Sequence, residues 1–257
     1  MAMSDTRLTF LGTGTSQGVP MIGCGCEVCR SRDSRDKRLR SSVLVDYKGL
    51  RILVDAGPDF RQQMLRAEVS HLDAILLTHN HKDHTGGLDD IRAFNYLEKK
   101  ATDIYCEKYV EESLRLEYSY AFVEKKYPGA PEWRVHNINE KPFEIKGVKI
   151  VPIRGMHYKL PVLGYRFGNI AYCTDMNHIA EEEFEKLKGL DHFIVNCVRY
   201  GKHISHFSLE EAVEVARKVG ARHSWITHLS HQLPPYTELA AELPKGILPA
   251  YDGLVIE

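Results

Sequence analysis

Residues 78–87 read THNHKDHTGG and supply four side chains of the kind that bind metals, His79, His81, Asp83 and His84. The preceding run DAILL at 73–77 is short, apolar and partly β-branched, which predicts a buried strand that delivers the motif at its end. Alternate residues of an extended chain point the same way, so His79 and His81 can share one cation, and Asp83 and His84 can reach a second. Imidazole together with carboxylate favours zinc, manganese or iron(II). We therefore expect a transition-metal site at the end of this strand.

The composition bounds the class of protein. The chain has 257 residues, of which 43% are hydrophobic, so it is long enough for one large α/β domain with a real core. Its formal net charge is -1, which predicts no broad surface for long nucleic acids but leaves a small anionic substrate or a short RNA end open. No apolar run approaches the roughly 18 to 20 residues of a membrane span, and the N-terminus lacks the apolar core of a signal peptide. We expect a cytoplasmic protein that does not contact a membrane.

The six cysteines fall into two groups. Three are scattered in apolar surroundings and are expected to be small core residues, namely Cys106, Cys173 and Cys197. The other three, Cys24, Cys26 and Cys29, form a C-x-C-x-x-C knuckle, which in a reducing compartment favours a metal over a disulfide. Three thiolates need a fourth ligand to close a structural zinc site, and that ligand must come from a distant part of the chain.

Two loops near the N-terminus allow more than one interpretation. The glycine-rich stretch GTGTSQG at 12–18 can cradle a phosphate through its backbone N–H groups, or it can be a tight turn. It is not a P-loop, because the Gly-Lys-Ser/Thr ending is absent. The segment 30–40 carries many basic residues, broken by Asp33 and Asp36, and is either a solvated loop or a surface that faces phosphate.

Strands and helices alternate along the rest of the chain. Apolar alternation around short turns predicts hairpins at 42–55, 143–153 and 163–175. Single strands are expected at 7–11, 71–78, 102–106, 192–197, 224–227 and 254–256. Helices are expected at 59–69, 88–99, 107–127, 180–188 and 208–219, the last with a capping box of Ser208 and Glu211.

The stretch 107–127 is charged and rich in tyrosine, and Pro128 ends it. Its aromatic side chains can form a lid, stack a base or bury a dimer face, whereas an ordinary amphipathic stripe facing the core is the default interpretation.

Several expected strands end on a ligand-type side chain. Asp55 and Asp175 each end the second strand of a hairpin, and His228 ends the strand at 224–227. A carboxylate in the place of Asp55 can hydrogen-bond a metal-bound histidine. The sheets and helices form two similar halves, which predicts a single α/β domain over residues 1–257 built as a four-layer αββα sandwich. The strand ends of both halves would then meet at one edge.

These residues resemble the metallo-β-lactamase superfamily over the whole chain. The H-x-H-x-D-H motif, Asp55, His157, Asp175 and His228 occur in the order of that family. The loop GTGTSQGVP at 12–20, the cysteine knuckle and THLSHQ at 227–232 resemble more closely the PhnP-like phosphoribosyl cyclic phosphodiesterases. The stretch 107–127 departs from that pattern, and substrate specificity can reside there.

The resemblance implies a role for each matching residue. One divalent metal, manganese or zinc, would be held by His79, His81 and His157, and a second by Asp83, His84 and His228. Asp175 would bridge the two metals, and Asp55 would support a ligand from behind. His231 would complete a structural zinc site with the three knuckle cysteines. His206 would act on the scissile phosphate, and Asp83 is counted with it as catalytic. His203 is an alternative to His206, and His178 can also approach the pocket.

The expected function is hydrolysis of a small phosphodiester, such as a phosphoribosyl or nucleoside cyclic phosphate, by a metal-bridging hydroxide. A tRNA 3′-end endonuclease is the runner-up with the same chemistry, although no glycine- and proline-rich basic arm is evident in the sequence. A persulfide dioxygenase with one iron is an alternative of another class, which the retained Asp83 and His84 disfavour. A homodimer is compatible with the sequence.

Overall fold

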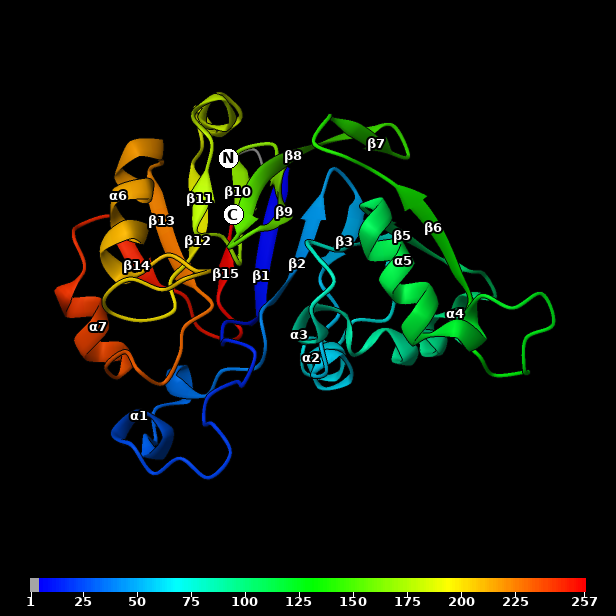
Figure 1. The fold of residues 1–257 in the computed structure, drawn as a ribbon, viewed down its shortest axis with the longest axis horizontal. Helices are drawn as coiled ribbons and strands as arrows, with labels where there is room; N and C mark the ends of the chain where they lie inside the picture. The colour runs from blue at the N-terminus through cyan, green and yellow to red at the C-terminus, as the bar shows by residue number, and fades with distance from the viewer. Residues whose placement is uncertain (1–4) are drawn as a thin grey trace.

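The computed structural model describes residues 5–257, so the N-terminal residues 1–4, for which no signal peptide was expected, lie outside it. Two β-sheets face each other at the centre, and helices cover their outer faces (Figure 1). The predicted four-layer αββα sandwich is confirmed. None of the helices among residues 5–257 is long and apolar enough to span a bilayer.

The first sheet has seven strands in the order β15-β1-β2-β3-β4-β5-β6. Their bounds are Thr6–Gly12 for β1, Ser42–Tyr47 for β2, Leu50–Val54 for β3, Ala74–Leu76 for β4, Thr102–Cys106 for β5, Trp133–Asn137 for β6 and Val255–Ile256 for β15. From β3 to β6 neighbouring strands run parallel. Their carboxyl ends therefore open at one edge of the sheet, where ligands usually bind.

The second sheet has the order β11-β8-β9-β10-β12-β13-β14, and β7 pairs with β8 outside this path. Its strands are Phe143–Ile145 for β7, Val148–His157 for β8, Leu160–Phe167 for β9, Ile170–Cys173 for β10, His178–Ile179 for β11, His192–Asn196 for β12, His223–Thr227 for β13 and Ile247–Pro249 for β14. From β10 to β14, sheet neighbours again run parallel. The sequence analysis did not predict β6, β11 or β14.

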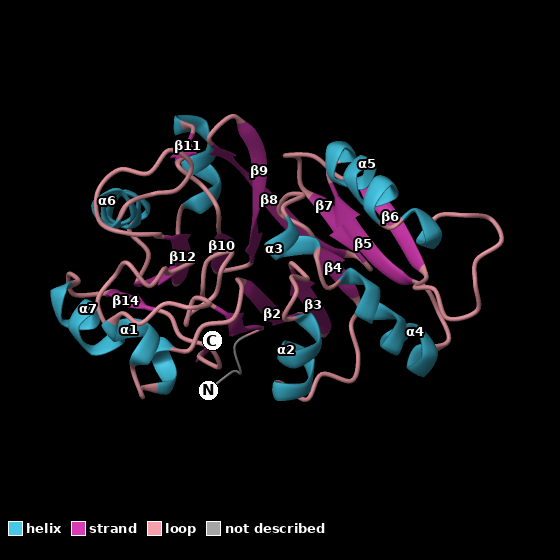
Figure 2. Cartoon of the chain, turned by 60° about the horizontal axis from the view of Figure 1, so that its bottom comes forward, coloured by secondary structure: helices cyan, strands magenta, loops and turns pink. Residues whose placement is uncertain are grey.

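The helices flank the sheets and frame the edge where the parallel strands end (Figure 2). Their bounds are Glu27–Arg30 for α1, Phe60–Arg66 for α2, Lys82–Thr85 for α3, Arg92–Glu98 for α4, Lys108–Glu117 for α5, Leu209–Val219 for α6 and Tyr236–Glu242 for α7. Of these, α1, α3 and α7 were not predicted. Single 3₁₀ turns or short 3₁₀ helices are η1 at Ser34–Asp36, η2 at Leu88–Ile91, η3 at Ser119–Ala121 and η4 at Glu181–Leu187. The helix predicted at 88–99 is thus a 3₁₀ turn followed by α4, and the one at 180–188 is entirely 3₁₀.

Three apolar cores lie between the four layers of the sandwich. One core lies between the sheets and includes Phe10, Tyr165 and Tyr172. A second packs the outer face of the second sheet, and a third packs that of the first sheet. Because the central strands are buried on both faces, they read as nearly continuous apolar runs. Tyr165 also joins the sheets directly, because its hydroxyl donates to the carbonyl oxygen of Leu77 at 2.7 Å.

Two predicted elements are shorter than expected near the site. The strand predicted at 71–78 is only Ala74–Leu76, because the chain bends after Leu77 and carries the histidines away from the sheet. The helix predicted over 107–127 ends at Glu117. There the backbone turns so that the Tyr118 hydroxyl donates to the Thr85 carbonyl oxygen at 2.8 Å, while Tyr118 stays 8% exposed. Tyr118 is thus a core residue, in line with the default interpretation of this stretch.

Candidate metal centre

The histidines of the motif gather at the carboxyl end of β4. The ring centroid of His79 lies 4.6 Å from that of His81 and 5.6 Å from that of His157. His157 is the last residue of β8, so this group joins both sheets. Nitrogen atoms of these three rings lie within 4.8 Å of one another, which suits one cation. The spacing of the motif predicted that His79 and His81 share a metal, and the family resemblance implied His157 as the third ligand.

A second group lies beside it and centres on Asp175. Ligand atoms of Asp83, Asp175 and His228 lie within 4.8 Å of one another. His84 joins this group through its Nε2, which lies 3.2 Å from Asp175 Oδ2 and 3.3 Å from Asp83 Oδ2. Asp175 also falls in one group with His79 and His84 and in another with His157 and His206. Its carboxylate is therefore placed between the two sets of ligands, as a bridging residue needs.

The backbone conformation at three strand ends is unusual and orients the side chains that follow. Asp55, Asp175 and His228 each follow a strand and each has a positive φ, of 64°, 58° and 57°. Non-glycine residues seldom adopt this left-handed conformation, and those that do are frequent at functional sites. The loop after β3 also lies directly on the motif, because a Cβ on Gly57 would be 2.0 Å from the Asp83 carbonyl oxygen.

Each buried histidine of the two ligand groups has a polar partner at its Nδ1 atom. His84 Nδ1 lies 2.6 Å from Asp55 Oδ2, while Asp55 also accepts bonds from the backbone N–H and the hydroxyl of Thr78. Thr78 Oγ1 is 2.9 Å from His79 Nδ1. The Ser205 carbonyl oxygen is 2.8 Å from His157 Nδ1, and Ser41 Oγ is 3.1 Å from His228 Nδ1. Such partners fix the ring orientation and the tautomer of a metal ligand.

Sequence reasoning singled out only Asp55 among these orienting groups. Thr78 could have been noticed because it directly precedes the motif and carries a hydroxyl. Ser41 and the Ser205 carbonyl oxygen are brought to the site by tertiary packing alone, and no spacing in the sequence announces them.

The electrostatics of the site are those of a cation site. Although burial works against ionisation, His228 and His84 hold the pKa of Asp175 well below its usual range. Burial also opposes a charge on His84, but Asp175, Asp83 and Asp55 together raise the pKa of that ring well above its ordinary value. Burial and then the charge of His84 hold the pKa of His79 well below its ordinary value. Charged carboxylates and a neutral imidazole are the forms that bind metals, and the carboxylates that favour a proton on His84 would hold a cation in its place.

An orphaned nitrogen atom tests whether metals fit. The Nε2 atom of His79 is buried and has no hydrogen-bond partner among residues 5–257, whereas that of His84 faces the carboxylates of Asp83 and Asp175. A buried polar atom without a partner is costly, and a ligated metal ion would satisfy it. Imidazoles with two carboxylates suit zinc or manganese, so the residues present fit two divalent transition metals.

His206 stands beside both groups. Its ring centroid lies 4.5 Å from that of His157 and 4.8 Å from that of His228. Burial and the neighbouring His228 lower the pKa of His206 to about 3, and its Nδ1 is buried without a hydrogen-bond partner among residues 5–257. His203 lies one step further out, with its ring 5.1 Å from that of His206. His178 is exposed on β11 and belongs to none of the possible metal groups found among residues 5–257.

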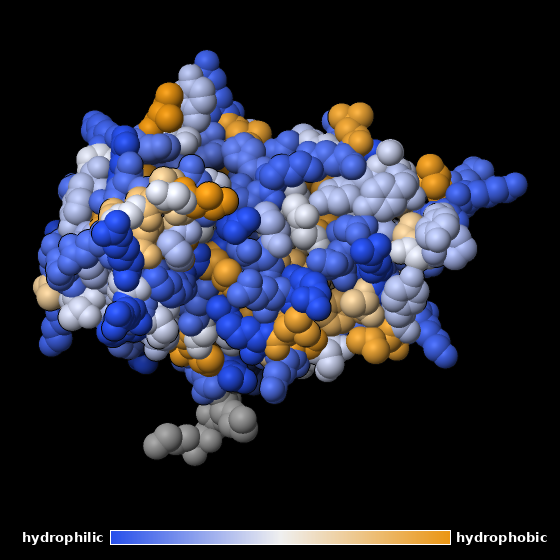
Figure 3. Space-filling model, turned by 90° about the horizontal axis from the view of Figure 1, so that it is seen from below, coloured by the Kyte–Doolittle hydropathy of each residue, from blue (hydrophilic) through white to orange (hydrophobic). Residues whose placement is uncertain are grey.

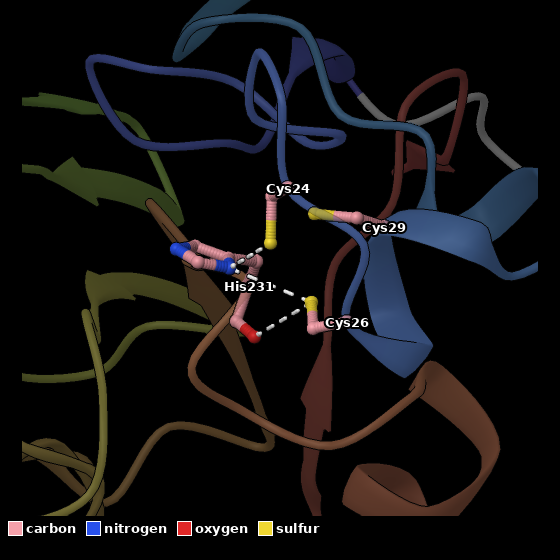
Figure 4. A group of neighbouring side chains, drawn as sticks. All are labelled: Cys24, Cys26, Cys29 and His231. Atoms are coloured by element: carbon pink, nitrogen blue, oxygen red, sulfur yellow. Dashed lines mark hydrogen bonds between the residues drawn. The ribbon is translucent and has the colours of Figure 1, made fainter.

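The side chains of the cysteine knuckle gather around His231 (Figure 4). His231 Nδ1 lies 3.3 Å from Cys24 Sγ and 3.5 Å from Cys26 Sγ, and a ligand atom of Cys29 completes a group within 4.8 Å. Hydrogen bonds from the Cys29 backbone and His231 lower the pKa of Cys26 to about 6. Burial raises the pKa of Cys29 to about 11. One thiolate, two further sulfurs and an imidazole fit a structural zinc ion, which would fasten residue 231 to residues 24–29.

A substitution at His231 distinguishes the metal of the knuckle from those of the active site. Replacing His231 by alanine is expected to lower total zinc by one equivalent per chain and to reduce the melting temperature by several degrees, because structural zinc contributes directly to folding energy. Metal analysis and thermal unfolding measure both effects. Replacement of the exposed His178 by alanine is the control and should change neither. Unchanged zinc content in the His231 variant would contradict this role.

The glycine-rich loop at 12–18 and the basic segment at 30–40 make hydrogen bonds to other parts of the fold. The Thr13 N–H donates to Asp252, the Gly14 N–H to the Leu39 carbonyl oxygen and the Gly18 N–H to that of Thr15. A Cβ on Gly12 would lie 1.9 Å from the Arg40 carbonyl oxygen, so close backbone approach explains a glycine there. In the basic segment 30–40, Arg38 is buried and donates to the carbonyl oxygen of Ala250. Both loops therefore favour the structural interpretation over phosphate binding.

The sequence profile of the Beta-lactamase superfamily domain matches residues 50–229, which span the motif, Asp175 and His228. The chain belongs to the metallo-β-lactamase superfamily. Within it the chain is PhnP-like, because a solved structure described as a new diphosphatase from the PhnP family superimposes with a TM-score of 0.91 at 39% identity. That match covers 98% of this chain and 96% of the other. Membership of this superfamily and the likeness to the PhnP-family structure support a metal-dependent hydrolase.

Two further relatives show how far the likeness reaches. An octanoyltransferase of Porphyromonas gingivalis is 44% identical over 251 residues, but the match covers 96% of this chain and 51% of the relative. This chain therefore spans about half the length of that protein. The structure of human tRNase Z, short form, superimposes with a TM-score of 0.71 at 18% identity over 98% of each chain. At that identity the likeness shows the shared fold alone.

Proposed function

We propose that this protein is a phosphodiesterase that uses two divalent metals to hydrolyse a small cyclic phosphodiester. The observation that carries the proposal is the convergence of two ligand groups on Asp175, with the His206 ring 4.5 Å from that of His157 and Asp175 Oδ1 3.8 Å from His206 Nδ1. Retention of Asp83 and His84 in the second group supports two metals rather than the single iron of a dioxygenase. We propose zinc or manganese at these positions.

The chain's own residues set the conditions for the reaction. When bound, two divalent cations supply Lewis-acid activation of a water molecule and neutralise charge on the phosphoryl oxygens. Hydrolysis adds water across one P–O bond, and the leaving oxygen gains a proton. His206 is a neutral imidazole in this environment, so it can donate a hydrogen bond to an oxygen on which negative charge develops. This supports stabilisation of the transition state over proton donation by an imidazolium.

The substrate is proposed to be small. The face that carries the strand ends is mostly hydrophilic, and its apolar residues lie in small separate groups (Figure 3). The near-neutral formal charge of -1 gives no general attraction for long nucleic acids. A homodimer stays a prediction. The octanoyl transfer named for the Porphyromonas relative belongs to a chain about twice as long as this one.

A panel of phosphate esters tests the proposal. We expect protein reconstituted with manganese or zinc to cleave nucleoside 2′,3′-cyclic phosphates and phosphoribosyl 1,2-cyclic phosphate faster than bis(p-nitrophenyl) phosphate. The panel includes a nucleoside diphosphate ester, because the PhnP-family structure is described as a diphosphatase. Precursor tRNA and oxygen uptake with a persulfide complete it. Cleavage of the diphosphate alone or of precursor tRNA alone would overturn the assignment, as would oxygen consumption with a single iron.

A further inference from the structure

The tip of the β8–β9 hairpin stands at the edge of the metal centre. The two strands remain paired up to His157 and Leu160, so only Tyr158 and Lys159 form the turn. His157 belongs to the first ligand group, and its ring centroid is 5.0 Å from that of His81 and 4.5 Å from that of His206. A side chain on this turn is therefore adjacent to the place where a substrate must sit.

Tyr158 has an unusual conformation for its residue type. Its φ is 57°, in the left-handed region that bulky residues rarely adopt. The hairpin turns at Lys48-Gly49 and Lys146-Gly147 have glycine as their second left-handed residue and no aromatic side chain. Burial does not explain the tyrosine, because it is 52% exposed. An exposed aromatic residue held in a strained conformation beside a metal ligand points to a functional role.

The Tyr158 ring is available to a ligand. Among residues 5–257 it has no aromatic partner, and its hydroxyl has no hydrogen bond. The ring makes a cation–π contact with Lys159, whose Nζ lies 5.3 Å from the ring centroid. Two of the other exposed tyrosines differ, since Tyr120 donates to Asp89 and Tyr200 to Glu242.

Hydrogen bonds fix this tip against the loop that carries His206. The Tyr158 N–H donates to Asn177 Oδ1 at 2.9 Å, and Asn177 Nδ2 donates to the Ile204 carbonyl oxygen at 3.1 Å. The bond between His157 Nδ1 and the Ser205 carbonyl oxygen runs beside them. Turn and loop thus form one wall, on which Tyr158 and Ile204 are exposed, the latter at 67%. Such a preformed wall loses little freedom when a ligand binds.

We propose that Tyr158 is a specificity-determining residue that stacks on the planar base of a nucleoside-type phosphodiester. The inference rests on the proposed function and deepens it, because it names the organic part of the substrate. Aromatic side chains stack on bases of any sequence, and an apolar neighbour such as Ile204 extends the contact. Sugar phosphates without a base offer no flat surface to Tyr158 and would bind less tightly.

Two substrates that differ only in the base test this role. Adenosine 2′,3′-cyclic phosphate is compared with methyl β-ribofuranoside 2′,3′-cyclic phosphate, which has the same reacting group. We expect Tyr158→Ala to raise KM for the adenosine substrate about 10-fold or more, with a much smaller change in kcat. The effect on the methyl riboside should be several-fold smaller, and Tyr158→Phe should restore most of the preference. Tyr127→Ala, at an 80% exposed tyrosine outside the site, should match the wild type on both substrates.

A binding measurement distinguishes failure of this inference from failure of the proposed function. Calorimetric titration with adenosine 2′-monophosphate should show about 10-fold weaker binding to Tyr158→Ala than to Tyr158→Phe. If cyclic diesters are hydrolysed but Tyr158→Ala affects both substrates equally or neither, the base-stacking role is wrong and the phosphodiesterase assignment stands. If neither diester is hydrolysed but the nucleotide binds through Tyr158, the assignment fails and the stacking role stands. If neither diester is hydrolysed and nucleotide binding does not depend on Tyr158, both the phosphodiesterase assignment and the stacking role are wrong.

Discussion

Replacing Asp175 by alanine is expected to release both active-site metals and to lower phosphodiesterase activity on the order of 10³-fold or more. Asp175 carries the largest effect because its carboxylate belongs to three of the possible ligand groups and lies 3.2 Å from both His84 Nε2 and His228 Nδ1. A Lewis-acid metal is worth several kcal/mol in the transition state, and each roughly 1.4 kcal/mol is tenfold in rate. Loss of the carboxylate also removes the negative charge that attracts the cations.

Metal counting makes the test specific. We expect three metal equivalents in the wild type, one in Asp175→Ala and two in His231→Ala, because the knuckle and the active site share no ligand. Circular dichroism and thermal unfolding establish that the variant is folded. If Asp175→Ala kept three equivalents, or kept its activity, the proposed bridging position would be wrong.

Replacement of His206 by alanine is expected to leave all three metals bound and to lower turnover about 10²- to 10⁴-fold, the usual range for a group that assists proton transfer or charge stabilisation. The ring is near both ligand groups but is not needed to complete either. Because burial holds its pKa near 3, we expect a neutral side chain that donates a hydrogen bond to preserve part of the rate, so His206→Asn should exceed His206→Ala.

The neighbouring His203 provides the matched control. Its ring is 5.1 Å from that of His206, yet it belongs to none of the possible metal groups among residues 5–257. His203→Ala should therefore lose less than about tenfold in turnover, well short of the range expected for an assisting group. Equal losses in the two variants would remove the distinction between them, and loss of metal from His206→Ala would make it a ligand instead.

The motif and the strand ends predicted the arrangement of the site because their signals are local. Asp55, Asp175 and His228 each follow an apolar run, and parallel strands bring such positions to one edge. The orienting partners were harder to predict. The Ser205 carbonyl oxygen carries no side-chain signature, and Ser41 reaches His228 across 187 positions of sequence.

Local sequence patterns gave wrong or missing predictions for η4, for β14 and for the end of α5. Leu187 is buried and Phe184 packs beside the same core, a spacing of three that suits a 3₁₀ helix as well as an α-helix. The edge strand β14 has only three residues and includes Pro249, so it lacks the usual strand signal. In the stretch 107–127, Tyr118 leaves the helical path because its hydroxyl binds the Thr85 carbonyl oxygen, a contact that no periodicity predicts.

The ligand residues come from both sheets, since His79, His81, Asp83 and His84 follow β4 while His157, Asp175 and His228 belong to the second sheet or its loops. Metal binding and association of the two halves are consequently linked equilibria: separated halves would hold incomplete sites and bind weakly. Each cation stabilises the assembled chain by RT ln(1 + [M]/Kd), where M is the free metal. Bound metal would therefore favour unfolding of the two halves together, and we expect the stability of the chain to rise with the concentration of free metal.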